Sequence, residues 1–198
     1  MALGNGVENE NFKFGNTNLK GIEKQKLLWL IIYRKLTFDF HINSICKVAG
    51  QKLSALARIS SCIDSNHRTT LFNAFVRSQF SYSQLSWMFC SRTSNNKINR
   101  IHERSLRLIH NNYDVCYKEL LSISSDTSIH VRNLRTLMIE VFKYLNGLSP
   151  PIMNDIFSTR TVTYHLRNAR VLRSHNPRTV KYGTETVSIN QEYAYRKT

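Results

Sequence analysis

The run Asn95-Asn-Lys-Ile-Asn-Arg-Ile-His-Glu-Arg-Ser-Leu-Arg-Leu-Ile-His-Asn111 carries the clearest periodic pattern in the chain. At about 100° per residue, its apolar side chains share one half of a helical wheel. These side chains are Ile98, Ile101, Leu106, Leu108 and Ile109. Because such a half-apolar wheel is typical of a helix packed in a bundle, the pattern predicts an amphipathic helix over residues 95–111.

The opposite half of this helix is basic. Four cations fall within an arc of about 80°, with Glu103 to the side of it: Lys97, Arg100, Arg104 and Arg107. A solvated charged face is one interpretation. However, like charges three and four residues apart repel by about 0.2–0.5 kcal/mol per pair, which a polyanion would offset. We therefore predict that these cations contact the phosphates of a nucleic acid, following its backbone without reading bases.

Three further helices are predicted, two before this one in the sequence and one after it. Residues 39–60 have apolar side chains at three- and four-residue spacing, and Gly50 in their middle suggests a close helix contact. A second helix begins at Ser65, a favourable N-cap residue. Another covers residues 127–146 and ends before the Pro150–Pro151 pair.

The segments before and after the predicted helices do not show a helical pattern of apolar residues. Lys26–Tyr33 is short, apolar and bounded by charge, which favours a buried strand. Residues 158–198 carry many cations and little apolar pattern, which indicates either a basic, partly extended arm or a disordered tail. Within it, Arg167, Arg170 and Arg173 are further candidates for nucleic-acid contact. The predicted fold class is mainly α: an irregular segment (1–25), a strand remnant (26–38), a helical bundle (39–157) and the arm (158–198).

The overall charge supports a polyanionic partner. The chain has 198 residues with 28 Lys and Arg against 13 Asp and Glu, a net charge of +15, spread along its whole length. Nucleic-acid backbones are the commonest partners of such chains. A membrane surface would call for a concentrated basic amphipathic helix or a lipid signal, and neither is evident at the termini. We therefore expect no membrane partner.

Cysteine usage and hydropathy indicate a soluble, intracellular protein. The four cysteines lie far apart, with no Cys-x-x-Cys pair and no His at zinc-ligand spacing: Cys46, Cys62, Cys90 and Cys116. The longest apolar run, Leu27–Ile32, is too short to cross a bilayer. No targeting signal is seen, so the expected location is the nucleus or the cytoplasm.

Several short runs, in this order and spacing, resemble one family. They are Lys26-Leu-Leu, Arg34-Lys-Leu-Thr-Phe-Asp-Phe-His-Ile-Asn-Ser-Ile-Cys-Lys47, Lys52-Leu-Ser-Ala-Leu-Ala-Arg-Ile59, Ser78-Gln-Phe-Ser-Tyr82, Trp87-Met88, Asn96–Arg107, Asn146-Gly-Leu-Ser-Pro150, Leu166-Arg-Asn168 and Thr179–Glu185. Together they resemble the end of the palm, the thumb and the downstream region of reverse transcriptases from non-LTR (LINE-type, jockey-like) retrotransposons. The resemblance implies a thumb-like bundle that grips the template–primer, RNA–DNA or DNA, without sequence preference.

The sequence departs from the family in two ways. The family usually has Gly and Asp where this chain has Trp29 and Tyr33. Past Ser188 the familiar pattern stops, as in a truncated or frame-shifted copy. The resemblance also implies an endonuclease, fingers and palm that this chain does not contain, and the missing palm and fingers would be its partners in the whole enzyme.

The sequence gives no sign of catalysis. A polymerase holds two Mg²⁺ ions with closely spaced carboxylates, which the family takes from an aromatic-x-Asp-Asp turn. Here every aspartate is isolated: Asp39, Asp64, Asp114, Asp126 and Asp155. The pairs Cys62 with His67 and His102 with His110 have no third partner at a recognisable spacing, so structural or solvated roles are expected. We predict no enzyme activity, no metal and no cofactor.

The alternative function belongs to another class. A helical protein–protein module could dock through four aromatic side chains that the missing palm once covered: Phe72, Phe75, Phe80 and Trp87. A non-functional remnant of a retroelement is the remaining interpretation.

Overall fold

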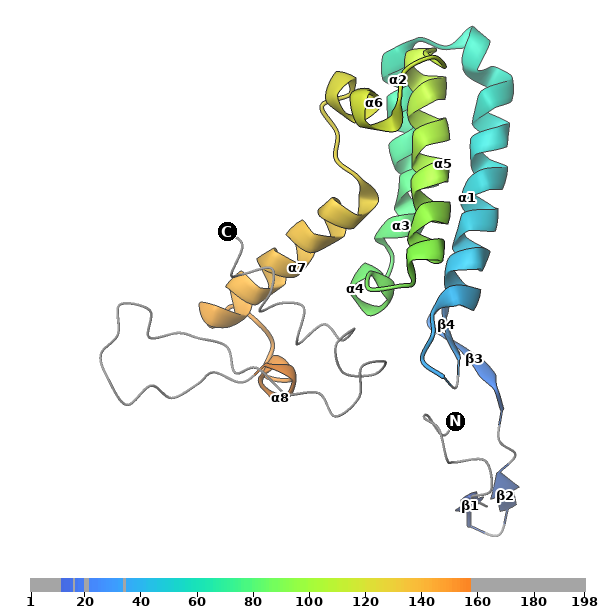
Figure 1. Ribbon diagram of the computed structural model, residues 1–198. Helices are drawn as coiled ribbons and strands as arrows, with labels where there is room; N and C mark the ends of the chain where they lie inside the picture. The colour runs from blue at the N-terminus through green and yellow to red at the C-terminus, as the bar shows by residue number, and fades with distance from the viewer. Residues whose placement is uncertain (1–11, 16, 20–21, 34, 158–198) are drawn as a thin grey trace. The chain divides into compact units, whose positions relative to one another are not determined.

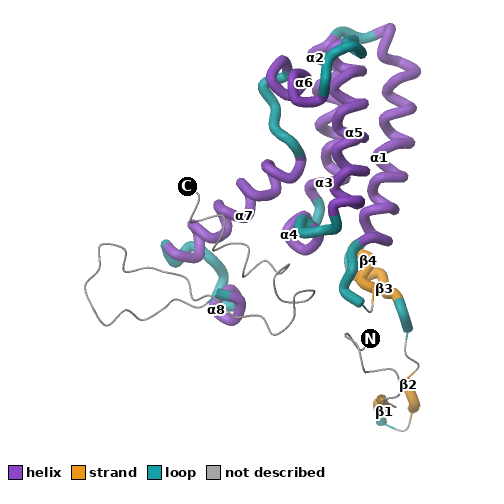
Figure 2. Tube along the Cα trace, viewed as in Figure 1, coloured by secondary structure: helices purple, strands orange, loops and turns teal. Residues whose placement is uncertain are grey.

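The structure, a computed structural model, describes residues 12–15, 17–19, 22–33 and 35–157. Figure 2 shows that most of this part of the chain is helical, and that strands occur only ahead of the helices. The predicted fold class, mainly α with a strand segment first, is therefore confirmed. The basic arm predicted for residues 158–198 lies outside the described residues.

The strands form two antiparallel hairpins. β1 (Phe12–Phe14) pairs with β2 (Thr17–Leu19), and β3 (Lys24–Leu27) pairs with β4 (Leu30–Tyr33). The single buried strand predicted for Lys26–Tyr33 is wrong in two respects, because the chain reverses at residues 28 and 29 and all of β3 is exposed. A short apolar run does not show whether the chain continues or turns within it.

The chain divides into two compact units. Unit 1 contains residues 1–83 and 90–126, and unit 2 contains residues 84–89 and 127–198. The helical part of unit 1 consists of α1 (Asp39–Ile59), η1 (Ser60–Cys62), α2 (Ser65–Leu71), η2 (Phe72–Arg77), α3 (Ser78–Ser81), α5 (Arg92–His110) and α6 (Tyr117–Ile123). The helix predicted from Ser65 has Asp64 at its cap position instead. α6 was not predicted.

Unit 1 is a helical bundle in which α1 and α5 run parallel, side by side (Figure 1). Ser94 near the start of α5 donates to Asp39 at the start of α1, with 2.5 Å between the oxygens. The segment α2–η2–α3 packs against both helices. It runs antiparallel to them, from the end of α1 back toward the start of α5 (Figure 1). At the far end, Ser65 of α2 donates to the carbonyl of Ile109 in α5 at 3.3 Å.

The core of unit 1 comes from the apolar stripes of these helices. α1 contributes Ile42, Ala49, Leu53 and Leu56; η2 and α3 contribute Phe72, Val76 and Phe80; α5 and α6 contribute Ile98, Leu106, Ile109 and Leu120. The three- and four-residue spacing of the stripes places them on one side of each helix. The close helix contact predicted at Gly50 is wrong, because a Cβ there would meet no atom within 4 Å.

Unit 2 contains α4 (Gln84–Trp87), α7 (Ile129–Leu145) and α8 (Met153–Ile156). Trp87 of α4 and Leu137 of α7 are each 1% exposed and belong to its core. Ser128 caps α7 by accepting from the Val131 amide at 3.3 Å.

Candidate nucleic-acid interface

Both ends of α5 are stabilised by polar groups. At its start, the Ser91 hydroxyl accepts from the Ser94 amide at 3.2 Å and satisfies one of the free N–H groups of the first turn. At its end, Asn111 adopts the left-handed conformation with φ 50°. The Arg68 guanidinium donates to the carbonyls of Leu108 and Ile109, both at 3.4 Å. α5 therefore begins three residues before the predicted range of 95–111 and is fixed in the bundle at both ends.

Three cations form a row along the outer side of α5. Lys97, Arg100 and Arg104 are all exposed. They fall within an arc of about 60° and span about 10 Å along the helix axis, at 1.5 Å per residue. Within the described ranges, no acidic side chain forms an ion pair with any of these three cations. Their charge faces solvent.

Arg107, the fourth predicted cation, does not belong to the row. Its guanidinium forms an ion pair with Glu103, 2.8 Å apart, and also donates to the carbonyl of Tyr113. Glu103 was predicted to lie to the side of the cationic arc, and from there it reaches Arg107, because the two side chains are four residues apart on one helix surface. Since Glu103 neutralises Arg107, the predicted phosphate contact of Arg107 loses its support.

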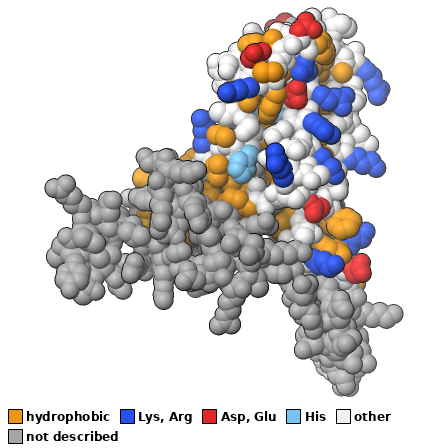
Figure 3. All heavy atoms as spheres, viewed as in Figure 1, with side chains coloured by type: hydrophobic (Ala, Val, Ile, Leu, Met, Phe, Trp, Pro, Cys, Tyr) orange, Lys and Arg blue, Asp and Glu red, His pale blue; other side chains and the backbone are white. Residues whose placement is uncertain are grey.

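A further cation on α1 adds to the row. The Lys97 ammonium donates to the amide oxygen of Asn43 in α1 at 2.7 Å. Lys47 is exposed and lies one helical turn beyond Asn43, on the same side of α1. Figure 3 shows Lys and Arg side chains spread over the visible face of this bundle, with fewer acidic side chains between them. We refer to Lys47, Lys97, Arg100 and Arg104 as the cationic face.

Sequence reasoning did not assign Lys47 to this site. A helical wheel places Lys47 opposite the apolar stripe of α1, but it does not show which helix packs beside it. The parallel packing of α1 and α5 supplies that information. The arm residues Arg167, Arg170 and Arg173 lie outside the described residues.

A buried polar cluster lies behind the cationic row, on the inner side of α5. The His102 side chain is fully buried, with its Nδ1 2.9 Å from the Tyr117 hydroxyl and its Nε2 3.5 Å from Asp126 Oδ2. Asp126 also forms an ion pair with Arg77, whose guanidinium lies 4.9 Å from the centre of the Phe72 ring. The cluster joins α5, α6 and η2, so it holds the cationic helix in place.

Within this cluster the Tyr117 hydroxyl is held in its neutral form. Burial, together with the negative charges of Asp126 and Glu103, raises the pKa of the Tyr117 hydroxyl well above its ordinary range. Tyr117 is therefore a neutral donor, and His102 can accept at Nδ1 while its Nε2 faces the carboxylate. The structural role expected for His102 agrees with this geometry.

Two of the thiols are also unreactive by environment. Burial raises the pKa of Cys46 and of Cys90 to about 11. Thiols held protonated in this way are poor nucleophiles and poor metal ligands. Within the described part of the chain, no group of three or more His, Cys, Asp or Glu side chains is arranged to hold a metal ion.

The aromatic docking surface of the alternative prediction does not form. Phe72 and Phe80 in unit 1 are each 2% exposed, and Trp87 belongs to the core of unit 2. Only Phe75 among the four predicted residues is exposed. Three of the four side chains stabilise the fold and are not accessible to a partner.

Comparison with known proteins found no matching family, no matching curated protein and no matching solved structure. Among the described residues, no helix has the length and apolar content needed to cross a membrane.

Proposed function

We propose that this chain binds the sugar–phosphate backbone of a nucleic acid through its cationic face. The observation that carries the proposal is the row Lys97, Arg100 and Arg104, which is exposed, of one sign and mounted on a helix capped at both ends. Cations held in a fixed row release the counterions of a nucleic acid on binding, and this favours association without sequence preference.

The resemblance to non-LTR retrotransposon reverse transcriptases fits this function. In that interpretation the chain is the non-catalytic, thumb-like part of an RNA-directed DNA polymerase, and it acts beside a palm and fingers in the nucleus or cytoplasm. The backbone at Trp29 supports the interpretation: its φ of 71° suits glycine, the residue that the family usually has there.

The salt dependence of binding tests the proposal. A labelled oligonucleotide of about 20 nucleotides is titrated by fluorescence anisotropy between about 50 and 200 mM NaCl. Replacing Lys97, Arg100 and Arg104 by Gln is expected to weaken binding and to reduce the log–log salt slope by about 2 to 3, because each phosphate contact contributes about 0.7 to 0.9.

The matched control removes the same charge elsewhere. Arg92, Lys118 and Arg135 are also exposed, so their triple Gln variant has the same net charge. It is expected to keep most of the slope. If both triple variants lose the same affinity and slope, binding depends on net charge alone and the cationic face is not the site. Arg107→Gln is expected to leave the slope unchanged, since Glu103 already neutralises that charge.

A further inference from the structure

The β3–β4 hairpin turns through two residues that normally avoid such a turn. Leu28 and Trp29 have φ values of 45° and 71°, both in the left-handed region. Two-residue hairpin turns of this kind strongly prefer Asn or Gly, because a side chain clashes with the backbone there. Strained turns persist only where the surrounding structure holds them, and they occur often at binding sites.

Three contacts hold this hairpin on the helical part of unit 1. The Tyr82 hydroxyl donates to the carbonyl of Leu28, within the turn itself. The rings of Tyr33 and Phe40 pack with centroids 5.1 Å apart, and the Ile31 amide donates to His41 Nδ1 at 3.5 Å. Because β4 is fixed to α1 in this way, the turn is presented in a defined position.

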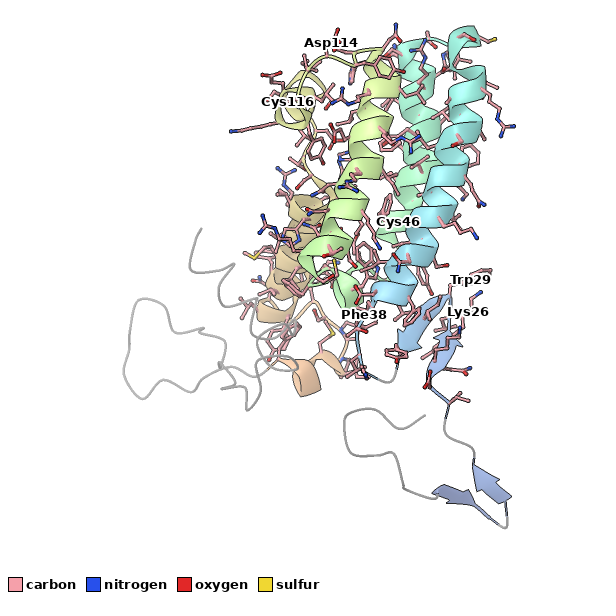
Figure 4. The ribbon with its side chains drawn as sticks, turned by 45° about the vertical axis from the view of Figure 1, so that its right-hand side comes forward. Lys26, Trp29, Phe38, Cys46, Asp114 and Cys116 are labelled. Atoms are coloured by element: carbon pink, nitrogen blue, oxygen red, sulfur yellow. The ribbon has the colours of Figure 1, made fainter. Side chains whose placement is uncertain are left out.

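The turn exposes a large aromatic side chain beside a cation. Trp29 is 74% exposed, and the Lys26 ammonium lies 3.4 Å from the centre of its ring. Figure 4 shows both side chains at the hairpin, next to the beginning of α1. Leu28 is 78% exposed as well, so the turn presents a small apolar surface to solvent.

The hairpin lies at the same end of unit 1 as the first residue of the cationic row. Asp39 at the start of α1 is bonded to Ser94 of α5, and Lys97 follows one turn later. A strand that follows the cationic face toward the start of α5 therefore runs toward the hairpin. Fixed aromatic rings next to a basic surface are the usual platform for unpaired bases.

We propose that Trp29 and Lys26 form a stacking site for an unpaired base at the end of the cationic face. The inference rests on the proposed function and narrows its ligand to nucleic acid with a single-stranded segment. A base covers the Trp29 ring while the Lys26 ammonium is within reach of the adjoining phosphate. Nucleic acid is favoured over an anionic membrane because the ring lies at the end of unit 1 from which the cationic row extends, so that one strand can reach both.

The experiment compares one single strand of about 12 nucleotides with the same sequence as a blunt duplex. The key variant is Trp29→Gly, because glycine accepts the left-handed turn and the hairpin is kept. It is expected to weaken single-strand binding roughly tenfold, with the salt slope and the duplex affinity unchanged. Trp29→Phe is expected to restore most of the loss, and Leu28→Asn, in the same turn, to cause none.

The outcomes separate the two proposals. If Trp29→Gly binds the single strand as the wild type does, while the Lys97, Arg100 and Arg104 triple variant does not, the stacking site is refuted and the proposed function stands. If the wild type binds neither oligonucleotide, both proposals fail. If Trp29→Gly loses binding to phosphatidylserine vesicles and not to the single strand, the turn is a lipid contact and the stacking site is refuted.

Discussion

Asp126 is the side chain on which the buried polar cluster depends. Its carboxylate neutralises Arg77 and faces His102, and both the Asp126 and Arg77 side chains are less than one-fifth exposed. Replacing Asp126 by Asn keeps the shape but leaves a buried guanidinium without its countercharge. We expect a loss of about 3 kcal/mol in the free energy of unfolding, measured by urea denaturation followed by circular dichroism.

The control for this substitution is Asp114→Asn, because Asp114 is an exposed carboxylate in the same unit. It is expected to change stability by less than about 0.5 kcal/mol. Pairing Asp126→Asn with Arg77→Met should recover part of the loss, since the stranded charge is then removed as well. Equal losses for Asp126→Asn and Asp114→Asn would mean that the cluster does not stabilise the bundle.

At the scale of the element, Gly50 is an unfavourable residue in the middle of α1. Gly50 lies in the middle of α1, and a Cβ added there meets nothing within 4 Å. Alanine restricts the unfolded chain more than glycine does, so Gly50→Ala is expected to stabilise the protein by about 0.5 to 1 kcal/mol. The midpoint of urea unfolding measures this. A loss of stability would show that α1 packs more tightly at Gly50 than the open space indicates.

How far the sequence predicts an element depends on the length of its pattern. The apolar spacing of α5 and α1 covers several turns, so both helices could be placed to within a few residues. α6 has seven residues, too few for a period to show. The hairpin turn was not predicted because Leu and Trp, at positions 28 and 29, are residue types that rarely form turns. The turn is held by a hydrogen bond from Tyr82, which is distant in sequence.

The candidate site shows the same limit. The row on α5 could be predicted because its members share one helix. Lys47 joins it only through the packing of α1 beside α5, and Arg107 leaves it only through its ion pair with Glu103. Contacts between residues distant in sequence, such as Arg77 with Asp126, follow from the bundle and not from any local spacing.

For the molecule as a whole, the net charge of +15 sets how it responds to acid. Lowering the pH adds positive charge to a chain that already repels itself, which favours the unfolded state. Of the described groups with shifted pKa values, Asp64 and His41 titrate on the acid side of neutrality, and they do so in different pH windows. The hydrogen bond from His67 lowers the pKa of Asp64, so this group contributes stability above its ordinary value near 3.8 and loses it only as the pH falls further.

Protonation of His41 also lowers the stability of the fold as the pH falls, but it does so at higher pH than protonation of Asp64. Burial lowers its pKa below 6.5, and its Nδ1 accepts the Ile31 amide proton, which requires the neutral ring. Below about pH 6.5 the unfolded chain therefore binds more protons than the folded one, and stability falls with pH by at most about 1.4 kcal/mol per pH unit for this group.

We expect unfolding free energy to decline from about pH 7.5 to 5.5. In His41→Asn, whose amide oxygen can accept the same proton without titrating, the decline should be shallower. Identical pH profiles for the two proteins would assign the acid sensitivity to net charge alone.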